Sequence, residues 1–265
     1  MARLWWCSST ALPGLVAAAG LLLLSLLLWW NRRQSGRKQR YCRLLFGAGR
    51  VSAGKREFGD GTVMTLREES VDPQVLVAEG FLSKEECESV IQEHQHLLSR
   101  STVYADDGSN KNDESRTSSS AYLGGGRPGT VLERIEKRAA ELLEVPLEHL
   151  ETLQLLRYEP SQKYDAHWDY FRNGPDASNN RTKTALVYLN DLEEGDEGGG
   201  TRFVKLGLEV RPVAGRVVTW SNCVAEEGLA ATAENCDERT LHAGEPPQRS
   251  VKYALNIWAR NMPAR

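Results

Sequence analysis

The sequence predicts an α+β domain in which two helices pack on one face of a mainly antiparallel sheet or barrel. Helical patterns occupy the first part of this domain, whereas from residue 151 onward the chain changes to short runs rich in β-branched and aromatic residues. Two helices followed by a succession of strands are typical of helices gathered on one side of a sheet. The predicted strands lie in "TLQLLRY", "KTALVYL", "TRFVKL", "GRVVTWS" and "VKYALNIWAR".

Two helices are expected before residue 151. Ser83 and Glu86 form a capping-box pattern ahead of an apolar stripe, so the first helix should begin just after Ser83. The second is predicted from residue 130 to 144, and Pro146 stops it. Between them, residues 105–129 are rich in Ser, Asp, Asn and Gly, which predicts one long surface loop that acts as a lid or binding segment.

The N-terminal region contains a candidate membrane anchor. After a tail of residues 1–10, residues 11–30 carry no charge and are long enough to cross a hydrocarbon core of about 30 Å as a helix. A cleaved signal peptide is the competing interpretation. Trp29 and Trp30 make a poor cleavage site, because such sites need small residues, so an uncleaved signal anchor is favoured.

Charge is strongly segregated along the chain. Residues 31–56 carry nine Lys or Arg and no Asp or Glu, which predicts a basic juxtamembrane stem within a linker of residues 31–65. From residue 57 onward, acidic residues outnumber basic ones by thirteen. The main domain, expected over residues 66–262, is therefore acidic, which argues against nucleic acid as its partner.

The five cysteines show neither metal-ligand spacing nor a C-x-x-C pattern. Cys223 and Cys236 flank a small loop and could pair in an oxidising compartment. Two free thiols are equally consistent with the sequence.

A candidate metal site begins in "KYDAHWDYF", residues 163–171. In an extended segment His167 and Asp169 point to the same side, so both can reach one ion. His242 precedes a predicted strand and is the natural third ligand. Two histidines and one carboxylate on one face of a metal are the arrangement of non-haem Fe(II) oxygenases. A chance His-x-Asp spacing is the alternative.

Lys252 argues against chance. It follows His242 by ten residues and shares one strand face with Ala254, Asn256 and Trp258. If this face is inward, a buried ammonium needs an anionic partner. An anionic cosubstrate such as 2-oxoglutarate would supply one.

Three blocks of the sequence resemble the core of the Fe(II)/2-oxoglutarate dioxygenases, and most of all the collagen-type and plant or algal prolyl 4-hydroxylases. The blocks are "LRYEPSQKYDAHWDYF", "ALVYLNDLEEGDEGGGTRF" and "LHAGEPPQRSVKYALNIWAR". The resemblance extends over residues 76–260. It implies a double-stranded β-helix (jelly-roll) core and 4-hydroxylation of peptidyl proline, coupled to oxidative decarboxylation of 2-oxoglutarate to succinate and CO2. Dioxygen as cosubstrate, ascorbate and a proline-rich peptide substrate are implied as well.

The same resemblance implies roles for individual residues. His167, Asp169 and His242 would ligate Fe(II), and Lys252 with Tyr188 would bind the distal carboxylate of 2-oxoglutarate. The pocket wall and a mobile loop that closes over the peptide complete the expected site. The wall would contain Tyr158, Thr201 and Trp258, and the loop Arg116, Thr117 and Ser118.

Membrane orientation is subject to two opposing arguments. Lys and Arg enrichment after the span favours leaving that side in the cytosol. The resemblance favours a single-pass protein of the endoplasmic reticulum or Golgi membrane with a luminal catalytic domain. Asn180, in the chain's one N-x-S/T sequon, is then a candidate glycosylation site.

Two further functions compete with prolyl hydroxylation. One is a dioxygenase of the same superfamily acting on lysyl residues or a small molecule, and the other is a catalytically dead peptide-binding domain. The set of His167, Asp169, His242 and Lys252 disfavours the dead domain. The sequence does not predict the oligomeric state.

Overall fold

The structure is a computed structural model that describes residues 54–105, 108–224 and 233–264. The predicted tail of residues 1–10, the predicted anchor of residues 11–30 and most of the basic stem lie outside these residues. Within the described part of the chain, the helices are all too short or too polar to span a bilayer.

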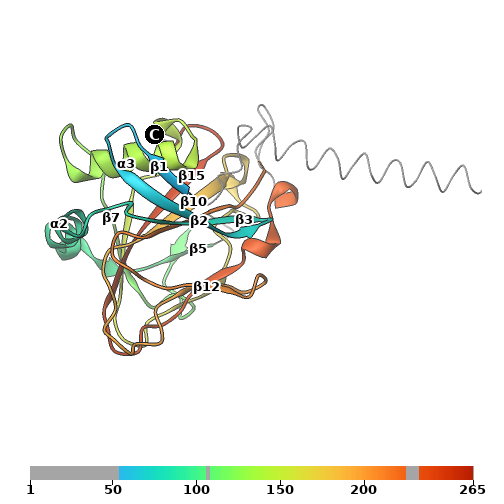
Figure 1. Cartoon of the computed structure of the whole chain (residues 1–265). Coiled ribbons are helices and arrows are strands. Elements are labelled where there is room, and N and C mark those ends of the chain that lie inside the picture. The colour runs from blue at the N-terminus through green and yellow to red at the C-terminus, as the bar shows by residue number, and fades with distance from the viewer. Residues whose placement is uncertain (1–53, 106–107, 225–232, 265) are drawn as a thin grey trace, which may run out of the picture. The chain divides into compact units, whose positions relative to one another are not determined.

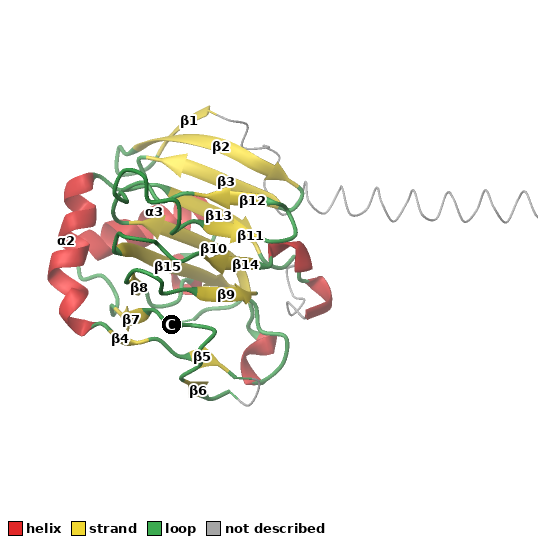
Figure 2. Cartoon of the chain, turned by 90° about the horizontal axis from the view of Figure 1, so that it is seen from below, coloured by secondary structure: helices red, strands yellow, loops and turns green. Residues whose placement is uncertain are grey.

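The core is built from antiparallel strands in two main sheets, and it contains few helices (Figures 1 and 2). The larger sheet has nine strands, in the order β1 (Gly54–Glu57), β2 (Val63–Val71), β3 (Gln74–Glu79), β13 (Val217–Ser221), β10 (Arg181–Tyr188), β15 (Lys252–Arg260), β8 (Gln154–Tyr158), β7 (Ser119–Tyr122) and β4 (Ser99–Arg100). The smaller sheet has four, in the order β12 (Leu208–Val210), β11 (Thr201–Phe203), β14 (His242–Gly244) and β9 (Tyr164–His167). A separate hairpin pairs β5 (Val103–Tyr104) with β6 (Asn110–Lys111).

Alternation along the strands gives the larger sheet two buried faces. On β10, Leu186 and Tyr188 belong to an apolar cluster shared with Phe203 and Val210 of the smaller sheet. The intervening Ala185 and Val187 point the other way, into the cluster formed with the helices. The larger sheet therefore lies between the helical layer and the smaller sheet.

The helical layer consists of α2 (Lys84–His94) and α3 (Val131–Leu143), as the sequence predicts. Both halves of the Ser83–Glu86 capping box are present at the start of α2. Figure 2 shows α3 behind the larger sheet, and its apolar residues pack into the outer cluster. The five predicted strands are also confirmed, as β8, β10, β11, β13 and β15. Single 3-10 turns occupy Gln95–Leu97, Leu147–His149, Pro175–Ser178, Ala233–Asn235 and Glu238–Thr240.

Two expectations about loops are wrong. The sheet extends into the predicted linker, because β1 pairs with β2 from Gly54 onward. Residues 105–129 are not one surface loop either, since β6 and β7 interrupt the stretch and β7 joins the larger sheet beside β8. The polar composition of these segments concealed the strands. They pair through backbone N–H and C=O groups, which polar residues carry as apolar residues do.

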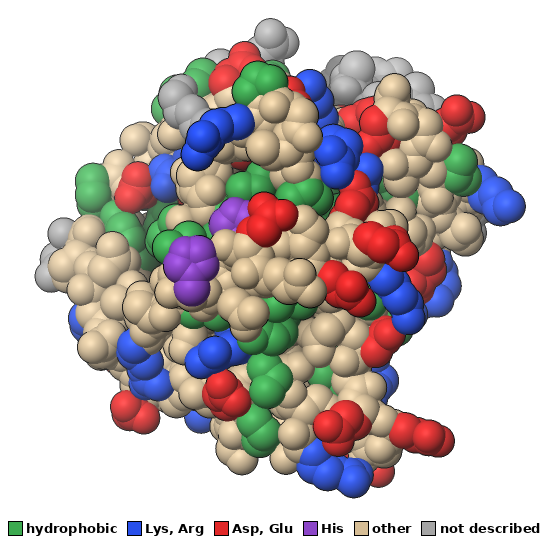
Figure 3. All heavy atoms as spheres, turned by 90° about the vertical axis from the view of Figure 1, so that its left-hand side faces the viewer, with side chains coloured by type: hydrophobic (Ala, Val, Ile, Leu, Met, Phe, Trp, Pro, Cys, Tyr) green, Lys and Arg blue, Asp and Glu red, His purple; other side chains and the backbone are tan. Residues whose placement is uncertain are grey.

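The surface view in Figure 3 shows acidic and basic side chains interspersed over one face. On this face the Lys and Arg side chains do not gather into the continuous basic patch that phosphate binding requires.

Candidate metal centre and active site

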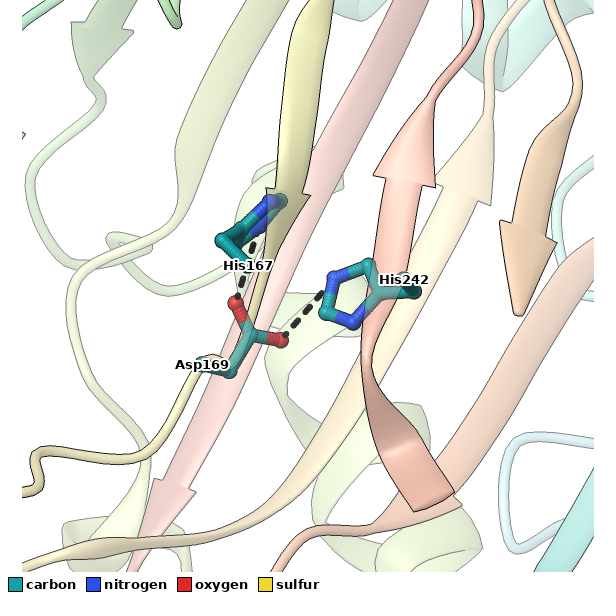
Figure 4. Close-up of side chains that lie close together, drawn as sticks. All are labelled: His167, Asp169 and His242. Carbon is teal, nitrogen blue, oxygen red and sulfur yellow. Dashed lines mark ion pairs between the residues drawn. The ribbon is translucent and has the colours of Figure 1, made fainter. Parts of the chain in front are cut away.

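The three predicted metal ligands meet at one edge of the smaller sheet (Figure 4). β9 pairs with β14 so that His167 lies directly opposite His242. Asp169 follows two residues after the end of β9, and Figure 4 shows its carboxylate directed between the two imidazole rings. Antiparallel pairing therefore joins ligands that are 75 positions apart in sequence.

The spacing of these side chains fits a single ion. Asp169 Oδ1 lies 3.7 Å from His167 Nε2, and its Oδ2 lies 3.8 Å from His242 Nε2. One ligand atom from each residue can be chosen so that all lie within 4.8 Å of one another. An ion held at about 2.1 Å from two donors requires them to be no more than about 4.2 Å apart, and both distances to Asp169 meet this condition.

Both histidines present the same nitrogen to the centre. Nδ1 of His167 lies 2.8 Å from the carbonyl oxygen of Asp165, and Nδ1 of His242 lies 2.9 Å from that of Thr240. A carbonyl only accepts, so each Nδ1 carries the proton and each Nε2 keeps its lone pair for the metal. Burial and the neighbouring His242 lower the pKa of His167 to about 3, which keeps its ring neutral.

A chain of hydrogen bonds holds Asp169. Thr184 Oγ1 donates to Asp169 Oδ2 at 2.7 Å, and Asn222 Nδ2 donates to Thr184 Oγ1 at 2.8 Å. Asn222 in turn accepts a bond of 2.8 Å from the indole of Trp220. Burial would raise the pKa of Asp169, but His242, His167 and the Thr184 bond outweigh it and lower the pKa. The carboxylate is thus ionised and fixed in orientation.

The metal centre opens into a pocket between the two sheets. Its space, including the open mouth, is about 380 Å3. The pocket is lined by Leu156, Tyr158, Tyr164, His167, Asp169, Leu186, Thr201, Trp220, His242, Gly244, Lys252, Ala254 and Asn256.

Lys252 supplies the cation of this pocket. It begins β15 opposite Tyr158 of β8 and is only 2% exposed. Its Nζ lies 5.0 Å from the centre of the Tyr158 ring and 5.5 Å from that of Tyr188. Among the described residues, no carboxylate lies within 4.0 Å of this ammonium group. Burial lowers the pKa of Lys252 to about 7, against a smaller opposing effect of Glu209 and Glu245.

The predicted pocket wall is present only in part. Tyr158 and Thr201 line the pocket, whereas Trp258 does not. Tyr188, expected to bind the distal carboxylate with Lys252, does not line the pocket either. The Tyr188 hydroxyl is already engaged, because it donates to the carbonyl of Val210 at 2.9 Å and lies 2.8 Å from Thr201 Oγ1. Trp258 lies on the expected strand face but beyond the pocket, with the Arg181 guanidinium 3.6 Å from its ring centre. The aromatic wall beside His242 is Trp220, at 4.7 Å between ring centres.

The predicted mobile loop is instead anchored in the core. Arg116 is buried and donates to Gln154 Oε1 and to the carbonyl of Thr102, both at 3.0 Å. Thr117 bonds through its backbone N–H to Lys163 at 2.9 Å, and Ser118 is fully buried. The Arg116 guanidinium also lies 4.6 Å from the ring centre of Tyr164, which stacks on His167 at 3.5 Å. Arg116 therefore supports the ring that stacks on His167, and all three residues are held in the core, so assigning them to a mobile loop was wrong.

Comparisons with known proteins agree with this site. The family model of the 2OG-Fe(II) oxygenase superfamily matches residues 153–260, which include all three candidate ligands and Lys252. Probable prolyl 4-hydroxylase 3 of Arabidopsis thaliana is 34% identical over 208 residues, covering 71% of this chain and 70% of that protein. The chain belongs to the prolyl 4-hydroxylase family. Probable prolyl 4-hydroxylase 10 of the same plant is likewise 34% identical, over 72% of this chain and 70% of its own length.

Solved structures agree with the family assignment. The viral collagen prolyl hydroxylase of Paramecium Bursaria Chlorella virus-1, solved as a 2OG complex, is 27% identical with a TM-score of 0.55. The match covers 70% of this chain and 95% of the viral protein. A prolyl hydroxylase of Trichoplax adhaerens shares the fold at a TM-score of 0.52 and 16% identity, over 71% of this chain and 83% of its own.

A disulfide in this prolyl 4-hydroxylase family member joins Cys223 to Cys236. It lies beside Trp168 and Tyr170, which flank the ligand Asp169. Just past it, the Asp237 N–H donates to the Asn222 carbonyl at 2.8 Å. The bond therefore ties the segment that leads into His242 to the end of β13.

We expect loss of this disulfide to destabilise the domain. Closing a loop of this size contributes roughly 3 kcal/mol to the free energy of unfolding, so the Cys223→Ser/Cys236→Ser variant should have a clearly lower Tm. Thermal unfolding with and without dithiothreitol measures the change in Tm. The reductant should lower the Tm of the wild type and leave that of the variant unchanged. An unchanged wild-type Tm under complete reduction would contradict the prediction.

The predicted glycosylation of Asn180 is wrong for the folded domain. Asn180 is fully buried, its Nδ2 donates to the Phe171 carbonyl at 2.8 Å, and its Oδ1 accepts the Phe171 N–H at 2.8 Å. A glycan on Nδ2 has no space there. The sequon is a match in the sequence only. In the fold, the side-chain amide of Asn180 holds the turn that follows His167 and Asp169.

We therefore predict that protein expressed in a secretory host keeps the same mass after endoglycosidase treatment. Replacing Asn180 with alanine should lower the free energy of unfolding by about 2 kcal/mol, because the Phe171 and Arg181 N–H groups lose their acceptor. Chemical denaturation measures this, with exposed Asn112→Ala as the matched control. Equal stability of the two variants would refute the assigned role.

The residues that support the ligands were missed by sequence reasoning. Thr184, Asn222 and Trp220 reach Asp169 only because β10 and β13 are neighbours. Tyr164 could have been found, since it lies three positions before His167 in the quoted aromatic stretch.

Proposed function

We propose that this chain is an Fe(II)- and 2-oxoglutarate-dependent prolyl 4-hydroxylase that acts on proline-containing peptides. The observation that carries the proposal is that His167, Asp169 and His242 line the same pocket as the buried cation Lys252. The curated relatives named as prolyl 4-hydroxylases support the reaction type.

The residues present fit both Fe(II) and 2-oxoglutarate. Two neutral imidazoles and one carboxylate on one side of an ion leave open positions, as Fe(II) oxygenases require. Lys252 is a buried ammonium whose neighbours leave it without a carboxylate partner among the described residues, so a ligand anion would compensate its burial. The distal carboxylate of 2-oxoglutarate is such an anion, and its 2-oxoacid end would then face the ligands.

The overall reaction balances without a further reductant. When bound, the iron supplies the oxygen-activating chemistry; one oxygen atom of O2 enters succinate as CO2 leaves, and the other enters the C4–H bond of proline as a hydroxyl. His167, Asp169 and His242 hold the metal, and Lys252 orients 2-oxoglutarate. Trp220, Leu186 and Leu156 line the pocket with apolar surface and limit access of water to it.

Several finer features belong to the same proposal. The core is a double-stranded β-helix, ascorbate sustains turnover, and the substrate is a proline-rich secretory protein. We further propose a single-pass protein of the endoplasmic reticulum or Golgi membrane, anchored by residues 11–30, with a luminal domain. The uncharged N-terminal stretch supports the anchor, and the Cys223–Cys236 disulfide supports an oxidising compartment. Digestion of the domain by protease added to intact vesicles would overturn the luminal orientation.

The test of the reaction is mass spectrometry of a polyproline-type peptide incubated with the protein, Fe(II), 2-oxoglutarate and ascorbate. We expect a gain of about 16 Da per modified proline, absent with His167→Ala. Succinate without peptide oxidation would retain the oxygenase and exclude this substrate. Absence of both, with iron and 2-oxoglutarate bound, would favour a peptide-binding domain.

A further inference from the structure

We propose that Asp196 is a positioning residue for the 2-oxoglutarate pocket, keeping Lys252 in place in the pocket that it shares with the metal ligands. The inference rests on the proposed function and concerns a residue that contacts neither iron nor cosubstrate. Its stretch, "DLEEGDEGG", has the composition of a solvated turn, but the structure shows a buried carboxylate within it.

Asp196 accepts hydrogen bonds from the segment that connects the metal ligand His242 to Lys252. Its Oδ1 accepts the Gln248 N–H at 2.9 Å, and its Oδ2 accepts the N–H groups of Arg249 and Ser250 at 3.0 and 2.8 Å. The Gly198 N–H adds a fourth bond, at 3.1 Å. Burial opposes ionisation, but these backbone donors hold the pKa of Asp196 well below its usual range. The bonds are therefore charge-assisted and strong.

The segment that Asp196 binds runs from the metal ligand His242 to Lys252, the cation proposed to bind the cosubstrate. His242 precedes it on β14, and Lys252 follows Ser250 by two residues. Regular pairing of β10 with β15 ends at Tyr188 and Ala254, so on that side the ladder does not reach Lys252. Beyond the end of this pairing, hydrogen bonds with Asp196 and its neighbours hold the segment in place of β10.

The contacts around Asp196 leave little freedom between the two segments. The Glu193 N–H donates to Ser250 Oγ at 2.9 Å, and the Gly199 N–H donates to the Pro246 carbonyl at 3.1 Å. A Cβ on Gly198 would lie 1.9 Å from the Pro246 oxygen, so only glycine permits this approach. The same stretch continues directly into Thr201 of the pocket wall.

The deciding experiment compares two ligands. In the proposed function Lys252 binds only the distal carboxylate, so its placement would govern the preference for 2-oxoglutarate over 2-oxobutyrate, which lacks that carboxylate. Affinities of both are measured by calorimetry on Mn(II)-loaded protein under anaerobic conditions. For Asp196→Asn we expect the preference to fall about tenfold, with 2-oxobutyrate affinity nearly unchanged. Glu194→Gln, an exposed change in the same turn, is the matched control and should bind like the wild type.

A second variant covers the case in which Asp196→Asn fails to fold. Ser250→Ala removes the hydroxyl that accepts the Glu193 N–H and that also hydrogen-bonds to Asp196, and it should reduce the same preference to a smaller degree. Equal loss of affinity for both ligands, or an unchanged preference in a folded variant, would overturn the positioning role. If the wild type itself does not prefer 2-oxoglutarate, the proposed function fails instead.

Discussion

Replacing His242 with alanine will reduce both succinate formation and peptide hydroxylation more than about 100-fold, because even outer partners of metal ligands change affinity or activity by 10- to 100-fold. His242 is 5% exposed and fixed by its Nδ1 bond to Thr240, so no neighbouring side chain can replace its Nε2. The loss should be accompanied by loss of bound iron. Metal analysis after gel filtration and succinate measurement by chromatography test both.

The matched control is His96→Ala, which removes an exposed imidazole from the turn after α2. It should retain iron and activity. A His242→Ala protein that keeps stoichiometric iron and turnover would show that the cluster of His167, Asp169 and His242 is not the catalytic metal site.

Lys252→Met will raise the KM for 2-oxoglutarate at least about 30-fold, since truncating one partner of a buried charge pair costs at least about 2 kcal/mol. Methionine keeps the length of the side chain and removes its charge. Initial rates over a range of 2-oxoglutarate concentrations give the effect. Lys183→Met, in the neighbouring β10, is the control, because Lys183 donates to the Leu143 carbonyl outside the pocket. Equal KM values for the two variants would contradict the assigned role of Lys252.

The same Lys252→Met substitution should stabilise the ligand-free protein. Burial lowers the pKa of Lys252 to about 7 from its ordinary value of 10.5, so between these values the unfolded chain binds more protons than the folded one. Stability of the wild type therefore rises with pH across this window. The Tm advantage of the variant should be largest at pH 7 and below and narrow toward pH 10. An advantage that grows with pH would mean that Lys252 is not buried as a charge.

Sequence patterns predicted the parts of this molecule that carry periodicity or chemistry. The capping box before α2, the extent of α3 and the β-branched runs of β8, β10 and β15 all appear where expected. The pair of His167 and Asp169 could be proposed because alternation in a strand is local. His242 and Lys252 followed from their spacing and from the need of a buried cation for an anion.

What failed depends on contacts between segments distant in sequence. Asn180 matches a sequon, but its burial is decided by how the turn after Asp169 folds back. Arg116 sits in a polar stretch and looks solvated, yet it pairs with Gln154 of β8 and covers Tyr164. In the sequence, Asp196 cannot be distinguished from the other acidic residues. Only the fold shows that the segment between His242 and Lys252 donates hydrogen bonds to its carboxylate.

The most direct test of the account is the fate of labelled dioxygen. Turnover under 18O2 with unlabelled 2-oxoglutarate and a polyproline-type peptide should place one heavy oxygen in each hydroxyproline, a gain of about 18 Da, and one in succinate. Both labels should disappear with His242→Ala. Hydroxyproline carrying only solvent oxygen, or oxidation that proceeds without succinate, would contradict a dioxygenase centred on His167, Asp169 and His242.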